Sequence, residues 1–464
     1  MNTPVAVEVL SAADAAPAQQ RAAGALRAMG LGVGDRVAFC LPSSSALLCA
    51  VLGALRTGVV PVMLNATLTM PERSALIADA EPGLVITEPE QLAALDGGPP
   101  VDLERFPLSR PMHYTSGTTG RSKGVWSGIW DAATAEAAFT DEADLWSFGP
   151  DDVHLVCSPM YHSVSIRFAG GTLLRGGTVV ILSRFDAHVA RDALGGRYGP
   201  VPTTTFIAPS SLARLLAAAS PGDLDGDPRG RAVRFDSLRL LVHAGSPCPP
   251  AVKHAAMERV GPGVVWEFYG STEGQFTACS TEEWVVRPGT VGRARPGRTL
   301  SVDGDGTIWC VPPPFARFEY WRDEAKTECA WRDGAFTVGD LGRLDDAGYL
   351  YIDGRRDDLI ISGGVNVYPA EVEGVLGDVP GVAEVAVFGL PDDRWGQRVC
   401  AAVVPSSPTD PTQADHLVES VRAHAVERLA GYKRPKQYVV LHALPRTATG
   451  KVQRNSIPGL VTSG

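Results

Sequence analysis

The sequence lacks several features that would assign it to a particular class of protein. It has no uninterrupted apolar stretch of about 18 residues or more, so we expect no transmembrane helix. Its first residues, MNTPVAVEVLSAADAAP, contain no basic segment followed by an apolar block, so they do not resemble a signal peptide. Internal repeats and long low-complexity linkers are also missing. These absences favour an ordinary globular protein.

The sequence has no excess of positive charge. Its formal net charge is −10 at pH 7, with 42 Lys and Arg residues against 52 Asp and Glu residues. This balance argues against nonspecific binding to nucleic acid, because such binding needs a basic surface. It does not exclude an anionic substrate, since a local site can be basic within an acidic protein. We therefore expect neither a nucleic-acid partner nor a membrane partner.

Cysteine pairs with the spacing of a metal or redox site are missing as well. The eight cysteines are scattered, none forms a C-x-x-C pair, and most lie in apolar runs. Such cysteines are expected to act as small buried hydrophobic residues. A reducing compartment fits this pattern, and we expect the protein to be cytoplasmic.

What the sequence does contain is a regular alternation of short apolar runs and helical patterns. The run DRVAFCL (35–41) predicts a strand, SSALLCAVLGALRTG (44–58) a helix, and VVPVML (59–64) the next strand. The same order recurs through TTTFIA, PSSLARLLAAA and LRLLVHAG (203–245). This alternation predicts an α/β fold with largely parallel sheets. At 464 residues, the chain is also long enough for two or three domains.

The pattern changes near residue 350. The segment DDAGYLYIDGRRDDLI (345–360) predicts a tight hairpin with Gly348 at its turn. Short strands and one amphipathic helix (413–431) follow, and together they predict a small α+β domain of about a hundred residues. We therefore expect a large N-terminal domain of stacked α/β subdomains over residues 1–354 and a small C-terminal domain over residues 355–464.

One loop, TSGTTGRSKG (115–124), is unusually rich in hydroxyl residues and glycines. Backbone N–H groups freed by glycines, hydroxyl groups and one ammonium, Lys123, are suited to hold a polyanion. The spacing is not that of a Walker motif, because Gly124 rather than a hydroxyl residue follows Lys123. The alternative is a solvated flexible turn.

With three further motifs, this loop resembles the adenylate-forming superfamily, which includes acyl-CoA synthetases, peptide-synthetase adenylation domains and luciferases. The four motifs are YTSGTTGRSKG (114–124), FYGSTEG (268–274), the segment 336–373 that contains VGDLGRLDDAGYLYIDGRRDD, and PRTATGK (445–451). They occur in the order found in the family and cover nearly the whole chain. The resemblance implies ATP, Mg²⁺ and coenzyme A as the cofactor and substrate set.

The resemblance assigns roles to residues of each motif. Glu273, a hard carboxylate suited to Mg²⁺, is expected to bind the metal together with Thr118; without the resemblance, Glu273 would more often be a helix-capping residue. Lys451 is expected to move over the active site and to neutralise the carboxylate and the α-phosphate as the acyl-adenylate forms. The residues expected to bind the nucleotide are Thr115, Ser116, Gly117, Thr118, Thr119, Gly120, Lys123, Tyr269, Gly270, Ser271, Thr272, Asp340 and Arg355.

Arg355 is expected to accompany Asp340 at the ribose, and the alternative is a surface ion pair with Asp357 or Asp358. The resemblance also implies that the small domain rotates about a hinge at Asp357. In the rotated state Gly363 and Gly364 would let a pantetheine arm approach closely. The alternative for these two residues is an ordinary glycine turn.

The acid is expected to bind between three segments, 159–171, 243–250 and 269–278. The pocket residues implied by the resemblance are His162, Arg167, His243, Gly245, Ser246, Gly270, Gln275 and Phe276. His162 matches a gate beside the reacting carboxylate; on its own it would more often be a structural residue. Arg167, Gln275 and Phe276 stand where many fatty-acyl members carry small or apolar residues. We expect a compact aromatic or polar acid, or one with a second anionic group at Arg167, unless Arg167 is paired elsewhere.

Three functions follow from these patterns. The first is an ATP-dependent acid–CoA ligase of specialised metabolism, acting on a compact aromatic, polar or medium-chain acid as a monomer or homodimer. The second is an adenylating enzyme with another acceptor, either a phosphopantetheine carrier or an amine, including nitrite activation for diazotisation. The third is a noncatalytic nucleotide-binding protein, against which the presence of Lys123, Glu273, Asp340 and Lys451 together argues. A shortened N-terminus and a compressed segment, 303–321, suggest a divergent branch.

Overall fold

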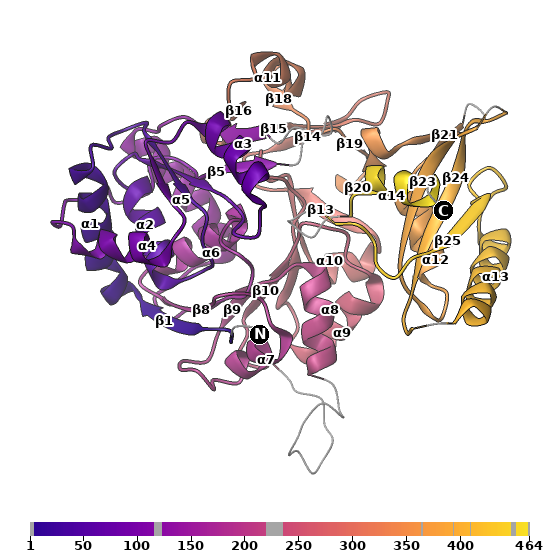
Figure 1. The fold of residues 1–464 in the computed structure, drawn as a ribbon, viewed down its shortest axis with the longest axis horizontal. Helices are drawn as coiled ribbons and strands as arrows, with labels where there is room; N and C mark the ends of the chain where they lie inside the picture. The colour runs from indigo at the N-terminus through magenta and orange to yellow at the C-terminus, as the bar shows by residue number, and fades with distance from the viewer. Residues whose placement is uncertain are drawn as a thin grey trace, which may run out of the picture. The chain divides into compact units, whose positions relative to one another are not determined.

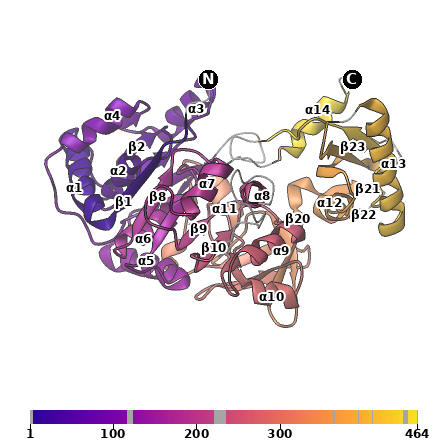
Figure 2. The same ribbon diagram turned by 90° about the horizontal axis from the view of Figure 1, so that it is seen from below.

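The computed structural model describes residues 4–115, 123–219, 235–362, 365–392, 394–408, 410–446 and 452–462 (Figures 1 and 2). The chain divides into two compact units. The first contains Met1–Leu300 and Cys310–Phe336, and the second contains Ser301–Trp309 and Thr337–Gly464. A domain border after residue 354 and a hinge at Asp357 stay predictions. Both describe a rotation of the small domain between two conformations.

The first unit contains two sheets whose inner strands are parallel. In the larger sheet the strand order is β1-β8-β7-β9-β10-β11-β12-β13, and the neighbouring pairs from β8 to β11 are all parallel. These strands are β1 (Val7–Ser11), β7 (Val153–Val156), β8 (Thr178–Leu182), β9 (Thr204–Phe206), β10 (Leu240–His243), β11 (Val265–Glu267), β12 (Thr277–Ser280) and β13 (Thr290–Ala294).

The second sheet has the order β16-β6-β5-β3-β2-β4. Strands β2 to β5 pair in parallel, and β6 and β16 add an antiparallel edge. The strands are β2 (Arg36–Phe39), β3 (Val60–Met63), β4 (Leu84–Ile86), β5 (Met112–Thr115), β6 (Lys123–Trp126) and β16 (Glu319–Tyr320). Parallel neighbours of this kind confirm the α/β fold predicted from the alternation of strands and helices.

One apolar cluster fills the space between the two sheets. It contains side chains of α1 (Ala12–Ala28), α2 (Ser45–Leu55) and α6 (Ser163–Leu174) together with strand residues of both sheets. Successive strand residues point to opposite faces, so Val37 and Phe39 of β2 enter this cluster whereas Ala38 packs on the opposite side. Both faces of the strands are therefore buried, as their continuous apolar runs require. Figures 1 and 2 show α1 and α2 side by side in this region.

Further short strands and helices complete the chain up to Phe336. Strand β15 (Ile308–Val311) pairs with β18 (Ala335–Phe336) through Cys310 and Phe336, and β18 pairs with β17 (Trp331–Arg332). The other helices and the remaining strand are α3 (Met70–Ala80), α4 (Pro89–Ala94), α5 (Ala132–Trp146), α7 (Ala187–Leu194), α8 (Pro209–Ala218), α9 (Pro250–Arg259), α10 (Thr281–Val286), α11 (Glu324–Ala330) and β14 (Thr299–Val302).

The second unit begins with the predicted hairpin. Strand β19 (Asp340–Leu344) pairs antiparallel with β20 (Tyr349–Arg355), and Gly348 between them has φ +79°. A left-handed conformation of this kind favours glycine, because it has no Cβ atom to clash with the backbone. The hairpin expected over this segment is confirmed.

The rest of the second unit is a small sheet covered on both faces. Alternating residues of β23 and β24 enter two clusters, one shared with α12 and α13 and the other with α14. Helix α13 lies along this sheet in both views (Figures 1 and 2). This arrangement confirms the small α+β domain. Its elements are β21 (Ile360–Ser362), β22 (Val365–Val367), α12 (Pro369–Gly377), β23 (Val382–Asp392), β24 (Gly396–Pro405), α13 (Pro411–Arg428), β25 (Gln437–Val440) and α14 (Ile457–Thr462).

Among the described residues, none of the helices combines the length and the apolar character needed to cross a bilayer.

Candidate active site

The hairpin of β5 and β6 carries the predicted phosphate loop at its tip. Thr115 at the end of β5 pairs with Lys123 at the start of β6, so the chain leaves and re-enters the sheet at one point. The loop residues to which the sequence assigned phosphate contacts lie outside the described residues: Ser116, Gly117, Thr118, Thr119 and Gly120.

Lys123 and Glu273 come together on either side of Tyr320. The Lys123 Nζ atom lies 5.6 Å from the centre of the Tyr320 ring, and the Tyr320 hydroxyl donates a hydrogen bond of 2.9 Å to Glu273 Oε1. The side chain of Lys123 is largely buried, and this burial lowers its pKa below the usual value, with Lys326 adding to the effect. The phosphate-loop lysine and the expected metal ligand therefore both interact with Tyr320.

Tyr320 is a site residue that the sequence did not indicate. It is held by strand β16, in which Tyr320 pairs with Val125 of β6, directly beside the phosphate-loop hairpin. It lies in the compressed segment 303–321, whose function could not be inferred. The sequence offered only a weak signal, the aromatic pair Tyr320–Trp321 behind three prolines, and nothing in that pattern specifies a contact with Glu273.

A narrow hairpin presents Glu273. The Ser271 N–H donates to the carbonyl of Gly274 at 2.8 Å, and the Phe276 N–H donates to that of Tyr269 at 2.9 Å. Gly270 is required at this crossing, since a Cβ atom there would lie 2.8 Å from the Gly274 carbonyl oxygen. The hairpin thus holds Ser271, Thr272 and Glu273 at its tip, next to Tyr320.

Phe276 differs from its expected place in the acid pocket. Its side chain is 0% exposed and packs between the rings of Tyr269, at 4.8 Å, and Phe336, at 4.9 Å. The neighbouring Gln275 points the other way and donates to Glu142 Oε2 at 3.2 Å. The physical reason is the extended backbone, in which successive side chains lie on opposite faces. Phe276 therefore packs in the core behind the hairpin, and a role in shortening the acid pocket stays a prediction.

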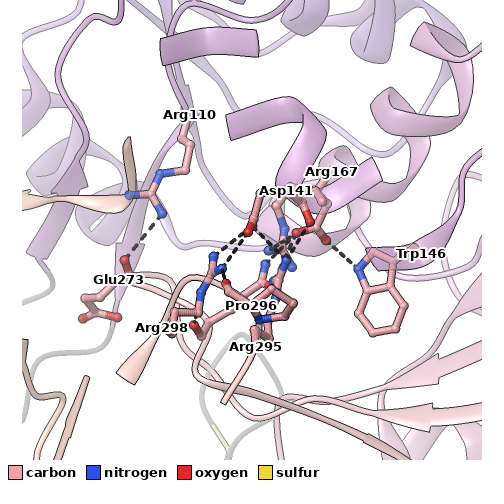
Figure 3. Close-up of polar contacts among 10 residues, drawn as sticks. Arg110, Asp141, Trp146, Arg167, Glu273, Arg295, Pro296 and Arg298 are labelled. Atoms are coloured by element: carbon pink, nitrogen blue, oxygen red, sulfur yellow. Dashed lines mark hydrogen bonds and ion pairs between the residues drawn. The ribbon is translucent and has the colours of Figure 1, made fainter. Parts of the chain in front are cut away.

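Arg167 is engaged by a carboxylate of the protein. Its Nη1 atom lies 3.5 Å from Glu142 Oε2 (Figure 3). The structure therefore has the alternative arrangement, in which Arg167 is paired with another residue of the protein. His162 occupies the N-cap position of the same helix, α6, without a capping hydrogen bond from its side chain, and its ring lies 4.6 Å from that of Tyr161. Gln275, Arg167 and Glu142 thus meet at one point, near the start of the helix that carries His162.

The remaining predicted pocket residues lie at the end of β10 and in the turn that follows it. His243, at the end of β10, is fully buried, and neither ring nitrogen has a hydrogen-bond partner among the described residues. Burial lowers its pKa to about 3, with the charge of Lys253 adding to the effect, so the ring is neutral at pH 7. Gly245 and Ser246 follow in an exposed turn, in which Gly245 has φ +94°.

In the second unit, the two residues expected at the ribose are neighbours. Asp340 and Arg355 are partners in the β19–β20 ladder, and Arg355 Nε donates to Asp340 Oδ1 at 3.1 Å. Asp358, one of the two carboxylates of the alternative ion pair, lies 3.0 Å from Arg454. Asp357 is exposed in a short 3₁₀ turn. Gly363, Gly364 and Lys451 lie outside the described residues.

Comparison with known proteins finds matches over most of the chain. Residues 6–105 and 111–313 match the family described as AMP-binding enzyme, and residues 371–451 match the AMP-binding enzyme C-terminal domain. The chain is 32% identical to the indoleacetate–CoA ligase of Aromatoleum aromaticum over 97% of this chain and 93% of that protein.

Two solved structures are similar in fold and in sequence. ATP-bound MatB from Rhodopseudomonas palustris has a TM-score of 0.80 at 30% identity and covers 97% of this chain and 93% of its own. The o-succinylbenzoate coenzyme A synthetase of Bacillus subtilis, in complex with ATP and a magnesium ion, has a TM-score of 0.79 at 28% identity and covers 96% of this chain and 94% of its own.

Proposed function

The chain belongs to the family of AMP-binding enzymes, and on this premise we propose that it is an ATP-dependent ligase that joins a carboxylic acid to coenzyme A. The acid and ATP form an acyl-adenylate with release of pyrophosphate, and the thiol of CoA then displaces AMP. The main support for this proposal is that Lys123 lies against the ring of Tyr320 while the hydroxyl of Tyr320 binds Glu273. A cation for phosphate oxygens beside a carboxylate for a metal ion is the arrangement that adenylation needs.

The residues at this point fit Mg²⁺. Glu273 uses Oε1 to accept the bond from Tyr320, and no side chain in the described part of the unit donates to its Oε2. No group of three or more potential ligands gathers anywhere among the described residues. Mg²⁺ commonly takes one or two protein carboxylates and completes its octahedron with phosphate oxygens and water. Bound there, the ion would neutralise phosphate charge, and Glu273 would hold it.

The other roles follow the motifs. Lys123 and the hydroxyl-rich loop hold the β- and γ-phosphates, the Tyr269 ring lies against the base, and Asp340 with Arg355 holds the ribose. Lys451 neutralises the reacting carboxylate and the α-phosphate. Rotation about Asp357 then exchanges Lys451 for Gly363 and Gly364, which admit the pantetheine arm of CoA.

The acid is compact and aromatic, polar or of medium chain length, in keeping with the polar side chains of Gln275 and of Arg167 in α6. The eight cysteines are all free, which supports a cytoplasmic location, since disulfides are rare in reducing compartments. We take the enzyme to be a monomer or a homodimer, which its mass in solution would decide.

The test is pyrophosphate release with Mg²⁺-ATP over a panel of acids, each with and without CoA. The panel holds short, medium and long aliphatic acids, aromatic acids, dicarboxylic acids, and nitrite with an aryl amine. We expect one class of organic acid to support release, and CoA to increase turnover and to appear as the thioester. A rate of pyrophosphate release that does not change with CoA, or that needs nitrite or an amine, would contradict CoA as the acceptor. No release with any acid would overturn the ligase assignment.

Replacing Tyr320 with phenylalanine should weaken the response to magnesium. The variant keeps the ring beside Lys123 but removes the hydrogen bond to Glu273, and a bond to a charged group contributes about 1.5–3 kcal/mol. We expect the magnesium concentration that gives half-maximal pyrophosphate release to rise about tenfold, with a smaller change in the maximal rate. Tyr198, which is exposed, provides the matched control, and its phenylalanine variant should behave as the wild type. An unchanged magnesium response of the Tyr320 variant would show that Tyr320 does not orient Glu273.

A further inference from the structure

Three segments of the second unit that are far apart in the sequence meet at one guanidinium group. Arg454 lies in a short 3₁₀ turn, Arg454–Ser456, directly before α14. Its Nη2 atom donates to both oxygens of Glu373 in α12, at 2.8 and 2.6 Å, and its Nη1 atom donates to Asp358 Oδ2 at 3.0 Å. The two partners lie 81 and 96 positions earlier in the sequence. We call Arg454, Glu373 and Asp358 the Arg454 network.

The Arg454 network is shielded from solvent and well paired. The side chains of Arg454, Glu373 and Asp358 are 24%, 16% and 19% exposed, and Arg454 Nε also donates to Glu373 at 3.0 Å. Burial alone would lower the pKa of Arg454, but the two carboxylates outweigh burial and raise it. Glu373 is itself fixed, because it accepts a bond of 2.8 Å from the backbone N–H of Val387 in β23. Bidentate arginine pairs fix geometry as well as charge, so the network holds its three segments in one arrangement.

One end of the network lies next to the predicted hinge. Asp358 is the last residue of the 3₁₀ turn that follows β20, and it comes directly after Asp357. Strand β21 begins two residues later, at Ile360, which is 1% exposed and packs in the core of the small sheet. Arg454 is therefore bound to the small domain at the point where the chain enters it.

The other end of the network follows the expected catalytic lysine. Lys451, which lies outside the described residues, stands three positions before Arg454. Between them, Val452 forms an antiparallel bridge with Arg446, and the Gln453 N–H donates a further backbone bond of 2.8 Å across the same two segments. Three residues of extended chain span at most about 11 Å. The backbone of Lys451 is therefore attached within that distance of the anchored guanidinium group.

Precise placement of this lysine is what the proposed reaction needs. Its ammonium group has to lie against both the carboxylate and the α-phosphate while the acyl-adenylate forms, and a displacement of about 1 Å can slow a reaction by about 100-fold. A lysine side chain is also long, and it loses much rotamer freedom when it is held in place. The backbone that carries it must therefore be anchored, and the Arg454 network supplies such an anchor.

We propose that Arg454 is a positioning residue for Lys451, an inference that rests on the proposed ligase function. Its bonds to Glu373 and Asp358 make the segment after Lys451 move as one body with the part of the small domain next to the hinge. Rotation about Asp357 then brings the ammonium group to the same place in every catalytic cycle. Arg454 acts through Lys451 and not on the reacting atoms. Without Arg454, the ammonium group would still be present but would be spread over more positions.

The experiment measures the two half-reactions separately in Arg454→Gln. Pyrophosphate release in a single turnover, with Mg²⁺-ATP and the preferred acid, should slow by about 30- to 100-fold. The ATP concentration that gives half of the maximal rate and the conversion of added acyl-adenylate to the thioester should each change by less than about threefold, since the role proposed for Lys451 belongs to the first half-reaction. Arg454→Lys should recover part of the rate, because an ammonium group can pair with one carboxylate but lacks the planar fork that binds two.

A double-mutant cycle with Lys451→Ala tests whether Arg454 acts through the lysine. In the Lys451→Ala background, Arg454→Gln should slow pyrophosphate release by less than about threefold, because the group that it positions is already gone. A residue that only stabilises the small domain would instead slow the reaction by the same factor in both backgrounds. The cycle therefore separates positioning from a general loss of stability.

Two further variants guard against damage to the fold. Arg428 pairs with Glu427 at the surface of α13, at 3.6 Å, and Arg428→Gln should leave both half-reactions at the wild-type rate. Asp358→Asn keeps the bonds of Arg454 to α12, so the small domain should still fold if Arg454→Gln does not. It should slow pyrophosphate release by about 3- to 10-fold, and this loss should also disappear in the Lys451→Ala background.

Each outcome decides between these roles. Equal slowing of both half-reactions, or equal slowing with and without Lys451, would overturn the positioning role and leave the ligase function intact. So would an unchanged rate of pyrophosphate release in Arg454→Gln, or a loss confined to thioester formation. No release by the wild type with any acid of the panel would overturn the ligase function and this inference with it.

Discussion

Replacing Lys451 with alanine is expected to slow acyl-adenylate formation by about 100- to 1,000-fold. The ammonium group neutralises charge that develops between the carboxylate and the α-phosphate, and removal of one such group typically has an effect of this size. The measurement is pyrophosphate release in a single turnover with Mg²⁺-ATP and the preferred acid. Conversion of added acyl-adenylate to the thioester should change by less than about tenfold, since the role proposed for Lys451 belongs to the first half-reaction only.

A second lysine of the same unit serves as the control. Lys433 pairs with Glu371 on the surface, so Lys433→Ala should release pyrophosphate at the wild-type rate. Unchanged pyrophosphate release in Lys451→Ala would contradict the adenylation mechanism. An equal loss in both half-reactions would point to a damaged fold rather than to a specific role in adenylation.

Replacing Glu142 with alanine is expected to destabilise the first unit by about 3–5 kcal/mol. The change leaves Arg167 and Arg295 without their shared carboxylate, and removing one partner of a buried ion pair has effects of this size. The side chain is only 14% exposed, so solvent would compensate little. Chemical unfolding, followed by tryptophan fluorescence, gives the free energy. Glu136 pairs with Arg105 at the surface, and Glu136→Ala should cost less than about 1 kcal/mol.

The same carboxylate predicts how stability depends on pH. Burial alone would raise the pKa of Glu142, but Arg167 and Arg295 outweigh burial and lower the pKa from 4.5 to about 2. Because the folded-state pKa is depressed, the stabilisation is complete above about pH 4.5 and is lost as the pH falls toward about 2. The difference in unfolding free energy between the wild type and Glu142→Gln should therefore shrink between pH 5 and pH 3. A constant difference over this range would contradict the assigned pairing.

The fold could be predicted from local patterns. The alternation of apolar runs with helical segments predicted the parallel sheets, and Gly348 between two strand patterns predicted the β19–β20 hairpin. The four motifs predicted the family. All of these depend on the order of residues within about twenty positions, where strand and helix periodicity and turn chemistry operate.

The candidate site could be predicted only in part. The sequence indicated Lys123 and Glu273, which the structure brings to the same tyrosine, and Asp340 and Arg355, which it pairs. It did not indicate Tyr320, and it did not indicate that Phe276 would be completely buried.

By itself, then, the sequence determined the class of fold, the division into a large and a small part, and the residue types needed for adenylation. Only the tertiary structure decided which side chains meet: Arg167 and Arg295 with Glu142, and Arg298 with Asp141. These partners are separated by up to 157 positions in the sequence, and their contacts depend on which elements become neighbours. The need for these ion pairs is likewise a property of burial, because the same arginines would each be solvated and need no partner on an extended chain.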